Sequence, residues 1–474
     1  MTTSPGGLSH ESTFDHDGAL SSTLITPTTS TNHDIEKFGE RDEALVPGRV
    51  PSTAEEKSDA VAIPSSPPGF DPASFPDGGL KAWLVVLGAF CCLIVSFGWI
   101  NCIGVFQAYY ETHQLREYSS QEVAWIPSLE SFMMFIGGLW VGRVYDNYGP
   151  RYLLIVGTFL HVFGLMMASI STKYWHFILS QGLCSALGAS MVFYPAMSAV
   201  VTWFFKKRAF ALGVVASGSG LGGVIFPIMV HKLIPEVGFG WTMRICAFLI
   251  LALLIVANIT VISRLPPHPR PMNWRDFLLP FTELPFFLLS VGSFLMFMGI
   301  FLPLNFLILA SAQAHVPHSL QIYLIPILNS ASIFGRIVPS FLADKVGRFT
   351  IFLAVCLAAT IFVWAIWLPG SGTGATVTFA VLFGFASGGV VALPATLVAS
   401  ISDVKQIGVR TGAMFSLVAV ATLVGNPIGG EIVTADHGSY QMLKVFSGCL
   451  TSAATICYAF LRYRLGGFSL KKKV

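Results

Sequence analysis

The stretch from Ile325 to Arg348 reads IPILNSASIFGRIVPSFLADKVGR and combines an apolar run with regularly spaced polar residues. On a helix, with 100° per residue, the polar side chains fall within about 80° of one another. They are Asn329, Ser332, Arg336 and Ser340. A cation in such a stripe costs roughly 2.5–3.5 kcal/mol to place in lipid. We therefore expect Arg336 to face a bundle interior or a water-filled path.

The same pattern occurs earlier, from Ile126 to Arg151, as IPSLESFMMFIGGLWVGRVYDNYGPR. Both stretches begin Ile-Pro-x-Leu-x-Ser and both end in Asp-x-x-Gly. The prolines are 326 − 127 = 199 residues apart, and the aspartates 344 − 146 = 198. This spacing indicates an internal repeat of about half a membrane domain.

Composition places the chain in a membrane. Of 474 residues, 54% are hydrophobic and 11% are charged, whereas a soluble globular chain carries about 25% charged residues. The net charge of +3 gives no reason to expect a nucleic-acid partner. The eight cysteines show no CxxC spacing and predict neither disulfides nor a metal site. With no nucleotide-binding or catalytic motif, we expect no cofactor and no enzyme activity.

Twelve apolar stretches have about the 20 residues that a membrane-crossing helix needs, which predicts an all-α membrane protein. They lie near 82–107, 122–142, 152–171, 176–204, 209–231, 241–263, 284–310, 319–342, 349–368, 376–400, 411–434 and 440–461. The predicted parts are a disordered cytosolic tail, a six-helix half, a cytosolic linker, a second six-helix half and a basic cytosolic tail, at 1–76, 77–264, 265–282, 283–463 and 464–474. Two parallel repeats that meet at a midplane site are typical of transporters.

The distribution of Lys and Arg predicts the orientation. Basic residues gather in the turns after spans 2, 4, 6, 8 and 10, whereas the alternate turns carry little more than Arg116, Lys173 and Lys232. Cytosolic loops carry the excess of positive charge, so we expect both termini in the cytosol. The expected location is the plasma membrane, with the vacuolar membrane as the alternative.

The turn 142–151, GRVYDNYGPR, resembles the signature of the major facilitator superfamily between its helices 2 and 3, and ADKVGR at 343–348 resembles its second copy. Glycine permits a tight turn, Asp can cap a helix N-terminus, and Arg can pair with that Asp. The resemblance implies the two-half fold of that superfamily and a cytosolic gate. The gate would comprise Gly142, Arg143, Asp146, Gly149, Arg151, Asp344, Gly347 and Arg348, with Lys206, Lys207 and Arg208 beside them.

Two further stretches resemble the signatures of the monocarboxylate porter family, in its fungal branch. They are DGGLKAW at 77–83 and WFFKKRAFALG at 203–213. The resemblance covers about 82–463. It implies a small-molecule substrate, and we expect this substrate to be an organic anion.

Compared position by position with the family, this chain retains the residue for anion binding and differs at the residues of the proton relay. Arg336 matches the carboxylate-binding Arg of the family. Asn101 stands where the animal members carry Lys, Ser332 where they carry Asp, and Leu212 where they carry Asn. The resemblance therefore implies anion binding at Arg336 without the lactate–proton mechanism.

Glu130 is the candidate for a coupling proton. It is the only acid well inside the spans of the first half and occupies the repeat position of Asn329, since 329 − 130 = 199. Burial in apolar surroundings favours the protonated carboxyl group, which suits reversible protonation. The alternative is a structural Glu that is tied by hydrogen bonds to a neighbouring helix.

Small residues predict where helices approach closely. Gly218, Gly220, Gly222 and Gly223 in span 5 include a GxxxG pair, 218 and 222, and Gly425, Gly429 and Gly430 lie in span 11. Such residues let helix backbones touch. We expect these glycines to form the packing and sliding surface between the two halves.

Together these patterns favour secondary active transport of a small or medium organic anion across the lipid bilayer. The predicted substrate-binding residues are Arg336, Asn101, Tyr194, Asn305, Ser332 and Asn329. Two directions stay open: uptake of a nutrient such as a monocarboxylate, and export of a fungal secondary metabolite. A third alternative is a membrane sensor that binds a ligand without moving it.

Overall fold

The computed structural model describes residues 75–266, 275–402 and 406–467, and these residues form no strand. Residues 1–74 of the predicted tail, 267–274 of the linker and 468–474 of the basic tail lie outside the described ranges. The helices are α1 (Leu80–Val95), α2 (Phe97–Ile100), α3 (Ile103–Thr112), α4 (Ser120–Ile136), α5 (Gly138–Tyr148), α6 (Pro150–Ala168), α7 (Tyr174–Phe177), η2 (Ile178–Ser185), α8 (Ala186–Val201), α9 (Arg208–Thr260), α10 (Arg275–Leu278), η3 (Leu279–Thr282), α11 (Leu284–Gln313), α12 (His318–Gln321), α13 (Leu324–Val346), α14 (Arg348–Phe362), η4 (Val363–Trp367), α15 (Gly372–Ala392), α16 (Pro394–Ser400), α17 (Ile407–Ala435) and α18 (Gln441–Gly466).

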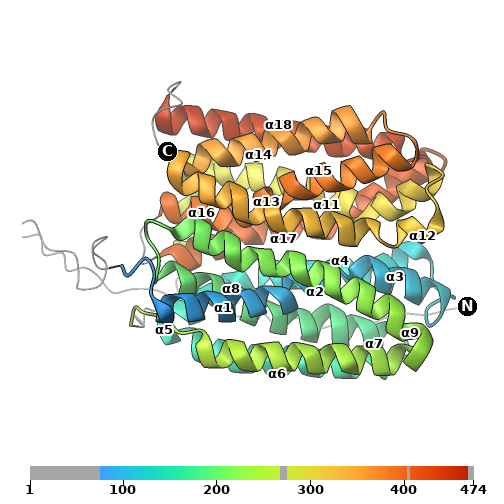
Figure 1. Cartoon of the computed structure of the whole chain (residues 1–474), viewed down its shortest axis with the longest axis horizontal. Coiled ribbons are helices and arrows are strands. Elements are labelled where there is room, and N and C mark those ends of the chain that lie inside the picture. The colour runs from blue at the N-terminus through green and yellow to red at the C-terminus, as the bar shows by residue number, and fades with distance from the viewer. Residues whose placement is uncertain (1–74, 267–274, 403–405, 468–474) are drawn as a thin grey trace, which may run out of the picture. The chain divides into compact units, whose positions relative to one another are not determined.

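Eleven helical segments of the described residues are long and apolar enough to cross a membrane. One of them, α9, has 53 residues and would be about 80 Å long if straight, far more than the ~30 Å of bilayer hydrocarbon. Its backbone turns at Gly238, where φ is 78°, and Figure 1 shows its two parts running in opposite directions. Counting α9 twice gives twelve crossings, which confirms the predicted all-α fold.

Both copies of the repeated turn contain a glycine whose backbone conformation would be strained in a residue with a side chain. Gly149 has a φ of 77° and Gly347 a φ of 141°, values that favour glycine because it has no Cβ. Each separates two helices, α5 from α6 and α13 from α14. The repeat in the sequence therefore produces the same helix–turn–helix connection in both halves.

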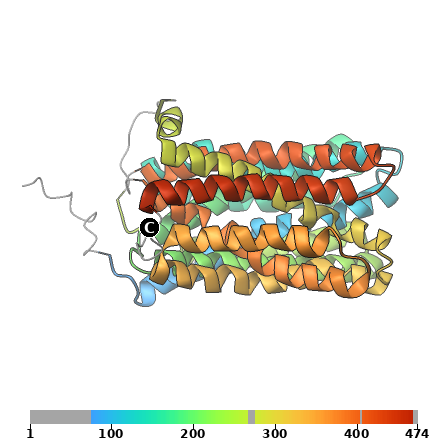
Figure 2. The same ribbon diagram turned by 90° about the horizontal axis from the view of Figure 1, so that it is seen from above.

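Helices of the first six spans and helices of the last six lie on opposite sides of the bundle in Figure 1, and Figure 2 shows the long helices running side by side. Two seams join these groups: α9 packs on α13, and α17 packs on α4 and α5. The boundaries 77–264 and 283–463 stay predictions.

The predicted sliding surface between the halves is wrong for four of its glycines and is confirmed for Gly220 and Gly223. Methyl groups at Gly218 and Gly222 would meet the backbone of α1, and groups at Gly425 and Gly429 would meet side chains of α11. These contacts lie within one half, not between the halves. The face of α9 that meets α13 carries Gly220 and Gly223, as predicted, and also Gly213.

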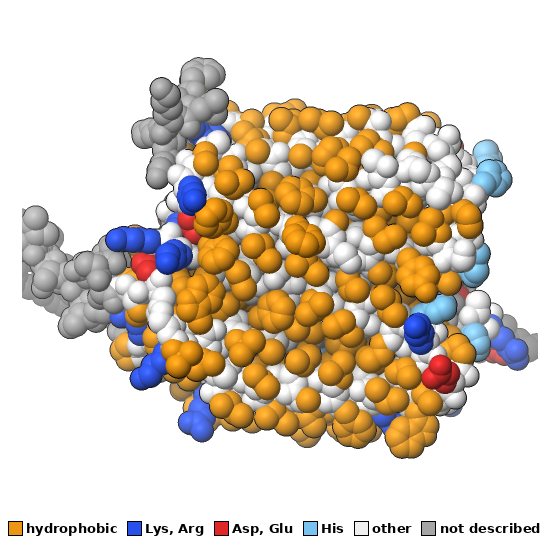
Figure 3. All heavy atoms as spheres, viewed as in Figure 1, with side chains coloured by type: hydrophobic (Ala, Val, Ile, Leu, Met, Phe, Trp, Pro, Cys, Tyr) orange, Lys and Arg blue, Asp and Glu red, His pale blue; other side chains and the backbone are white. Residues whose placement is uncertain are grey.

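The outer surface is apolar along most of its length. Hydrophobic side chains cover the middle of the face in Figure 3, and most of its Lys and Arg gather at one end. We call this the basic end of the bundle; the junctions between α5 and α6, α8 and α9, and α13 and α14 lie there (Figure 1). An apolar belt with charge at its ends is the surface that a membrane-crossing bundle requires.

Candidate functional site

The polar stripe of α13 lies in the seam with α9. Asn329 and Arg336 are 2% and 3% exposed, and Ser340 is fully buried. Opposite Ser340, Arg336 and Asn329, α9 presents Gly213, Gly220 and Gly223 respectively. Methyl groups at these glycines would lie too close to the three side chains, so glycine is what allows a polar stripe to fit between two helices of different halves.

Arg336 is a buried cation whose hydrogen-bonding capacity is partly unused. Its Nε and Nη1 atoms are buried and have no hydrogen-bond partner among the described residues. A methyl group at Gly220 would lie 2.7 Å from Nη1, so the guanidinium packs directly on the α9 backbone. An unpaired buried charge is costly. A carboxylate, which accepts two parallel bonds from a guanidinium, would offset that cost.

Two asparagines connect the halves beside this cation. Asn101, between α2 and α3, donates from Nδ2 to Oδ1 of Asn329 at 3.3 Å and to the carbonyl of Ser219 at 3.2 Å. Asn329 donates in turn to the carbonyl of Ile325 at 3.1 Å. The structure thus brings together three predicted residues, Asn101, Asn329 and Arg336, at one seam.

The other three predicted substrate-binding residues have partners elsewhere. The Ser332 hydroxyl donates to the carbonyl of Asn329 on its own helix at 2.8 Å. The Tyr194 hydroxyl donates to the carbonyl of Phe135 at 2.7 Å, and its side chain is buried. Asn305 donates to Oδ1 of Asn426 at 2.7 Å. Their predicted role in binding stays a prediction.

Tyr194 belongs to an aromatic cluster that also crosses between the halves. Its ring centroid lies 6.1 Å from that of Phe415 on α17, and Phe135 stacks on Phe415 at 5.6 Å. Phe297 of α11 lies 6.2 Å from Phe135. Sequence reasoning missed this cluster because 39 phenylalanines in one chain give no signal for which of them meet.

Glu130 on α4 is buried, with 2% of its surface exposed. The amide of Gln181 donates to its Oε2 at 3.0 Å, and the Tyr110 hydroxyl donates to Oε1 of Gln181 at 2.7 Å. The indole of Trp99 lies beside the same carboxyl group. Gln181 lies in η2, a π-helical segment, and such segments are frequent at functional sites. A glutamine in an apolar span was the available sequence signal for this partner.

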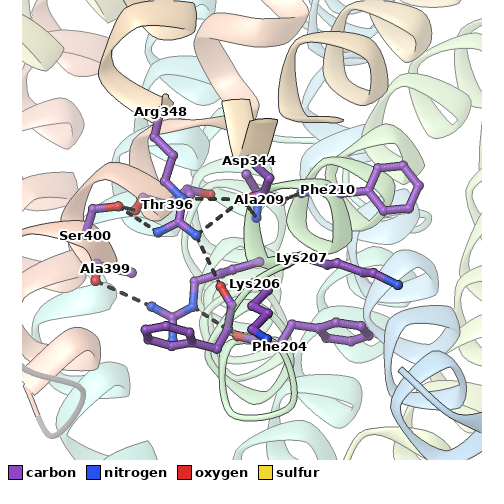
Figure 4. Close-up of polar contacts among 12 residues, drawn as sticks. Phe204, Lys206, Lys207, Ala209, Phe210, Asp344, Arg348, Thr396, Ala399 and Ser400 are labelled. Carbon is purple, nitrogen blue, oxygen red and sulfur yellow. Dashed lines mark hydrogen bonds and ion pairs between the residues drawn. The ribbon is translucent and has the colours of Figure 1, made fainter. Parts of the chain in front are cut away.

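At the basic end, the carboxylate of Asp344 connects the two halves. It accepts the backbone N–H groups of Ala209 and Phe210 at 3.2 and 2.9 Å, and Arg348 lies 3.2 Å from it (Figure 4). The unpaired N–H groups and the dipole of a helix N-terminus favour a carboxylate. The sequence predicted such a cap. The helix that Asp344 caps is α9, in the other half.

Two arginines extend this network. Arg348 donates to the carbonyl of Phe205 at 3.2 Å and to the Ser400 hydroxyl at 3.0 Å. Arg208, 1% exposed, donates from Nε to the carbonyl of Phe204 at 3.1 Å. Because these residues come from both halves (Figure 4), the network holds the basic end together.

The turn before α9 is also an anion site for the chain itself. Oδ1 of Asp77 accepts the backbone N–H groups of Phe205, Lys206 and Lys207 at 2.7, 2.8 and 3.2 Å. Successive N–H groups that converge in this way form a concave anion-binding turn. The side chains of Lys206 and Lys207 are exposed. The two signature stretches, at 77–83 and 203–213, therefore contact each other.

The first copy of the turn mirrors the second. A methyl group at Gly408, the second residue of α17, would lie 2.8 Å from Oδ1 of Asp146, and one at Gly142 would lie 2.7 Å from the carbonyl of Gly408. Asp146 thus lies at a helix N-terminus of the other half. Arg143 lies 3.8 Å from a carboxylate oxygen of α10, and Arg151 is exposed.

Comparison with known proteins places this arrangement among transporters. The family description Major Facilitator Superfamily matches residues 88–426. The protein named MFS-type transporter 1, from Ophiocordyceps sp., is 52% identical over 423 residues, 89% of this chain and 94% of the relative. The Fujikurins efflux protein of Gibberella fujikuroi is 44% identical over 391 residues, 82% of this chain and 84% of the relative.

A solved structure has the same fold. The transporter FucP in its outward conformation superposes with a TM-score of 0.61, over 81% of this chain and 99% of FucP. The two sequences are 15% identical. At this identity the similarity concerns the fold alone.

Proposed function

This chain belongs to the major facilitator superfamily of membrane transporters, and from that membership we propose that it exports an organic anion by alternating access. Its relatives include proteins named as efflux proteins, which favours export over uptake. The two halves would move against each other along the α9–α13 and α4–α17 seams, around a site near the middle of the bundle.

Arg336 is the observation that carries the proposed anion. Its buried Nε and Nη1 have no hydrogen-bond partner among the described residues, and Asn101 and Asn329 supply neutral polar groups at the same seam. A substrate carboxylate would pair with the guanidinium and receive further hydrogen bonds from the amides.

The basic end supports one half of the transport cycle. We place this end in the cytosol because its turns are rich in Lys and Arg. The bonds of Asp344 to the start of α9 then close the protein toward the cytosol. Export requires these bonds to open and admit the substrate, and to re-form when the substrate leaves.

Uptake of a monocarboxylate-like nutrient is the second candidate. The contact between Asp77 and the 205–207 turn joins the two stretches that resemble monocarboxylate porters. The direction of flux separates the candidates. Radiolabelled carboxylates, from lactate to dodecanoate, are offered to inside-out vesicles with an acidic lumen and to right-side-out vesicles. Export predicts accumulation in the inside-out vesicles, and accumulation only in the right-side-out ones would establish uptake.

The predicted orientation is testable by labelling. Lys207 and Lys173 are exposed residues of turns that the charge distribution assigns to opposite sides. In a variant without native cysteines, Lys207→Cys should react with an impermeant maleimide only from the cytosol, and Lys173→Cys only from outside. Labelling of both from one side would contradict the twelve-crossing topology.

Glu130→Gln should abolish pH-driven accumulation and leave substrate exchange intact, if Glu130 carries the coupling proton. Glutamine keeps the size and accepts the Gln181 hydrogen bond, but it cannot take up a proton. Both rates are measured in proteoliposomes. Glu236→Gln, an exposed acid on α9, is the matched control and should change neither. Equal loss of both rates in Glu130→Gln would instead assign it a structural role.

A further inference from the structure

An apolar groove of about 620 Å³ lies on the outer side of the α9–α13 seam. Val224 and Ile228 of α9 form one wall, Ile327 and Phe334 of α13 form the floor, and Phe385 of α15 belongs to the other wall. Phe334 is 64% exposed, so the groove opens to the surface that faces lipid. Its volume is within the range of sites for small organic molecules, about 300–1,000 Å³.

The groove is on the far side of α13 from Arg336, and the seam between them is thin. At 100° per residue, Phe334 and Arg336 point about 160° apart. Gly220 separates the two sides: a methyl group there would lie 2.7 Å from Nη1 of Arg336 and 2.8 Å from Cγ1 of Ile333. No side chain of α9 stands at this point, where the Arg336 guanidinium and the Ile333 side chain both pack against the α9 backbone.

The groove is apolar and Arg336 is a cation, so together they complement an amphipathic anion, which has an apolar part and a negative charge. We propose that the groove binds the apolar part of an amphipathic organic anion dissolved in the bilayer, which passes between α9 and α13 to bring its carboxylate to Arg336. This proposal rests on the proposed function and adds to it the substrate class and the route of entry. Because α9 and α13 belong to different halves, the movement that alternates access would also widen this seam.

A phospholipid tail is the competing occupant. Lipid tails are as apolar as the groove, so burial alone gives neither ligand an advantage. Only an anion small enough to pass the seam gains the contact with Arg336. Occupancy by such an anion must therefore depend on Arg336, whereas occupancy by lipid must not.

Photolabelling of the full chain in phosphatidylcholine vesicles tests the proposal. The probes are dodecanoic acid with a diazirine on its chain, the methyl ester of that acid, and phosphatidylcholine with a diazirine on one tail. The acid should label the groove residues of α13 and α15 saturably, at least fivefold above other lipid-facing helices. Excess dodecanoate should compete, and the ester and the lipid probe should show no such preference.

Two test variants and one matched control extend the experiment. Ala331→Trp fills the groove and should lower groove labelling by the acid at least fivefold. Ala453→Trp adds the same bulk at an exposed alanine of α18 and should leave it unchanged. Arg336→Gln should also lower saturable labelling at least fivefold.

The outcomes separate the groove from the transport proposal. Equal groove labelling by the acid, ester and lipid probes would overturn the inference and identify a lipid site. If Arg336→Gln impairs carboxylate transport while Ala331→Trp does not affect dodecanoate labelling or flux, the proposed function holds and the groove inference fails. Saturable groove labelling with flux that is independent of Arg336 would overturn the role of that arginine in transport and leave the groove as a binding site.

Discussion

Arg336→Gln is expected to raise the KM for a carboxylate substrate about ten- to a hundredfold, because a hydrogen bond to a charged group contributes roughly 1.5–3 kcal/mol. The guanidinium is buried and packs on the α9 backbone at Gly220. Arg336→Lys keeps the charge but loses the planar, two-pronged donor. Its KM should lie between those of the wild type and Arg336→Gln.

The measurement is initial flux of radiolabelled carboxylates into proteoliposomes, normalised to the amount of folded protein. Lys444→Gln is the matched control, because Lys444 is another largely buried cation and lies on α18, beside Trp367. It should leave the KM unchanged. An unchanged KM in Arg336→Gln would show that the anion binds elsewhere, and failure of that variant to fold would assign Arg336 to the packing of the seam.

Asp344→Asn should raise the equilibrium constant between the closed conformation and one that is open at the basic end by about thirtyfold. The carboxylate accepts two backbone N–H groups of α9 and contacts Arg348, all within the closed conformation. Asparagine removes the charge and one acceptor oxygen, at a cost of about 2 kcal/mol. Substrate flux should fall, because a protein that stays open at the basic end closes that end only slowly in each transport cycle.

A cysteine at Ser340 reports this opening. The side chain is fully buried and faces Gly213 across the seam, so Ser340→Cys should react slowly with an impermeant maleimide in inside-out vesicles. Adding Asp344→Asn should accelerate the reaction at least tenfold. Asp276→Asn is the control: its ion pair is 3.8 Å long and half exposed, and such pairs contribute little. An unchanged rate with Asp344→Asn would show that other contacts close the basic end.

Part of the site was predictable from local patterns. The stripe of Asn329, Arg336 and Ser340 follows from helical periodicity, and the structure buries all three in one seam. The capping role of Asp344 follows from the chemistry of a turn before a helix. The sequence did not indicate which helix it would cap, because the N–H groups that Asp344 accepts lie 135 and 134 residues earlier in the chain.

Local patterns did not predict the hydrogen-bond partner of Glu130, nor which glycines of α9 contact the other half. The sequence singled out Glu130 as a buried acid, but Gln181 is its partner only because η2 places that amide against α4. The GxxxG pair of α9 has the spacing of a helix contact, and it does make one, with α1 of the same half. Of the glycines that the sequence assigned to the contact between the halves, Gly220 and Gly223 make it, and Gly213 joins them.

The sequence by itself determined the membrane class, the twelve crossings, the repeat and the polar stripe around Arg336. Each of these depends on the length, period or charge of a single segment, and a segment that crosses a bilayer must satisfy its own backbone hydrogen bonds. Only the tertiary structure decided which helix faces meet, which buried polar groups pair and where a groove opens between α9, α13 and α15. The reason is that lipid is as apolar as the interior of the bundle. The sequence of an apolar helix face therefore does not indicate whether that face will contact lipid or protein.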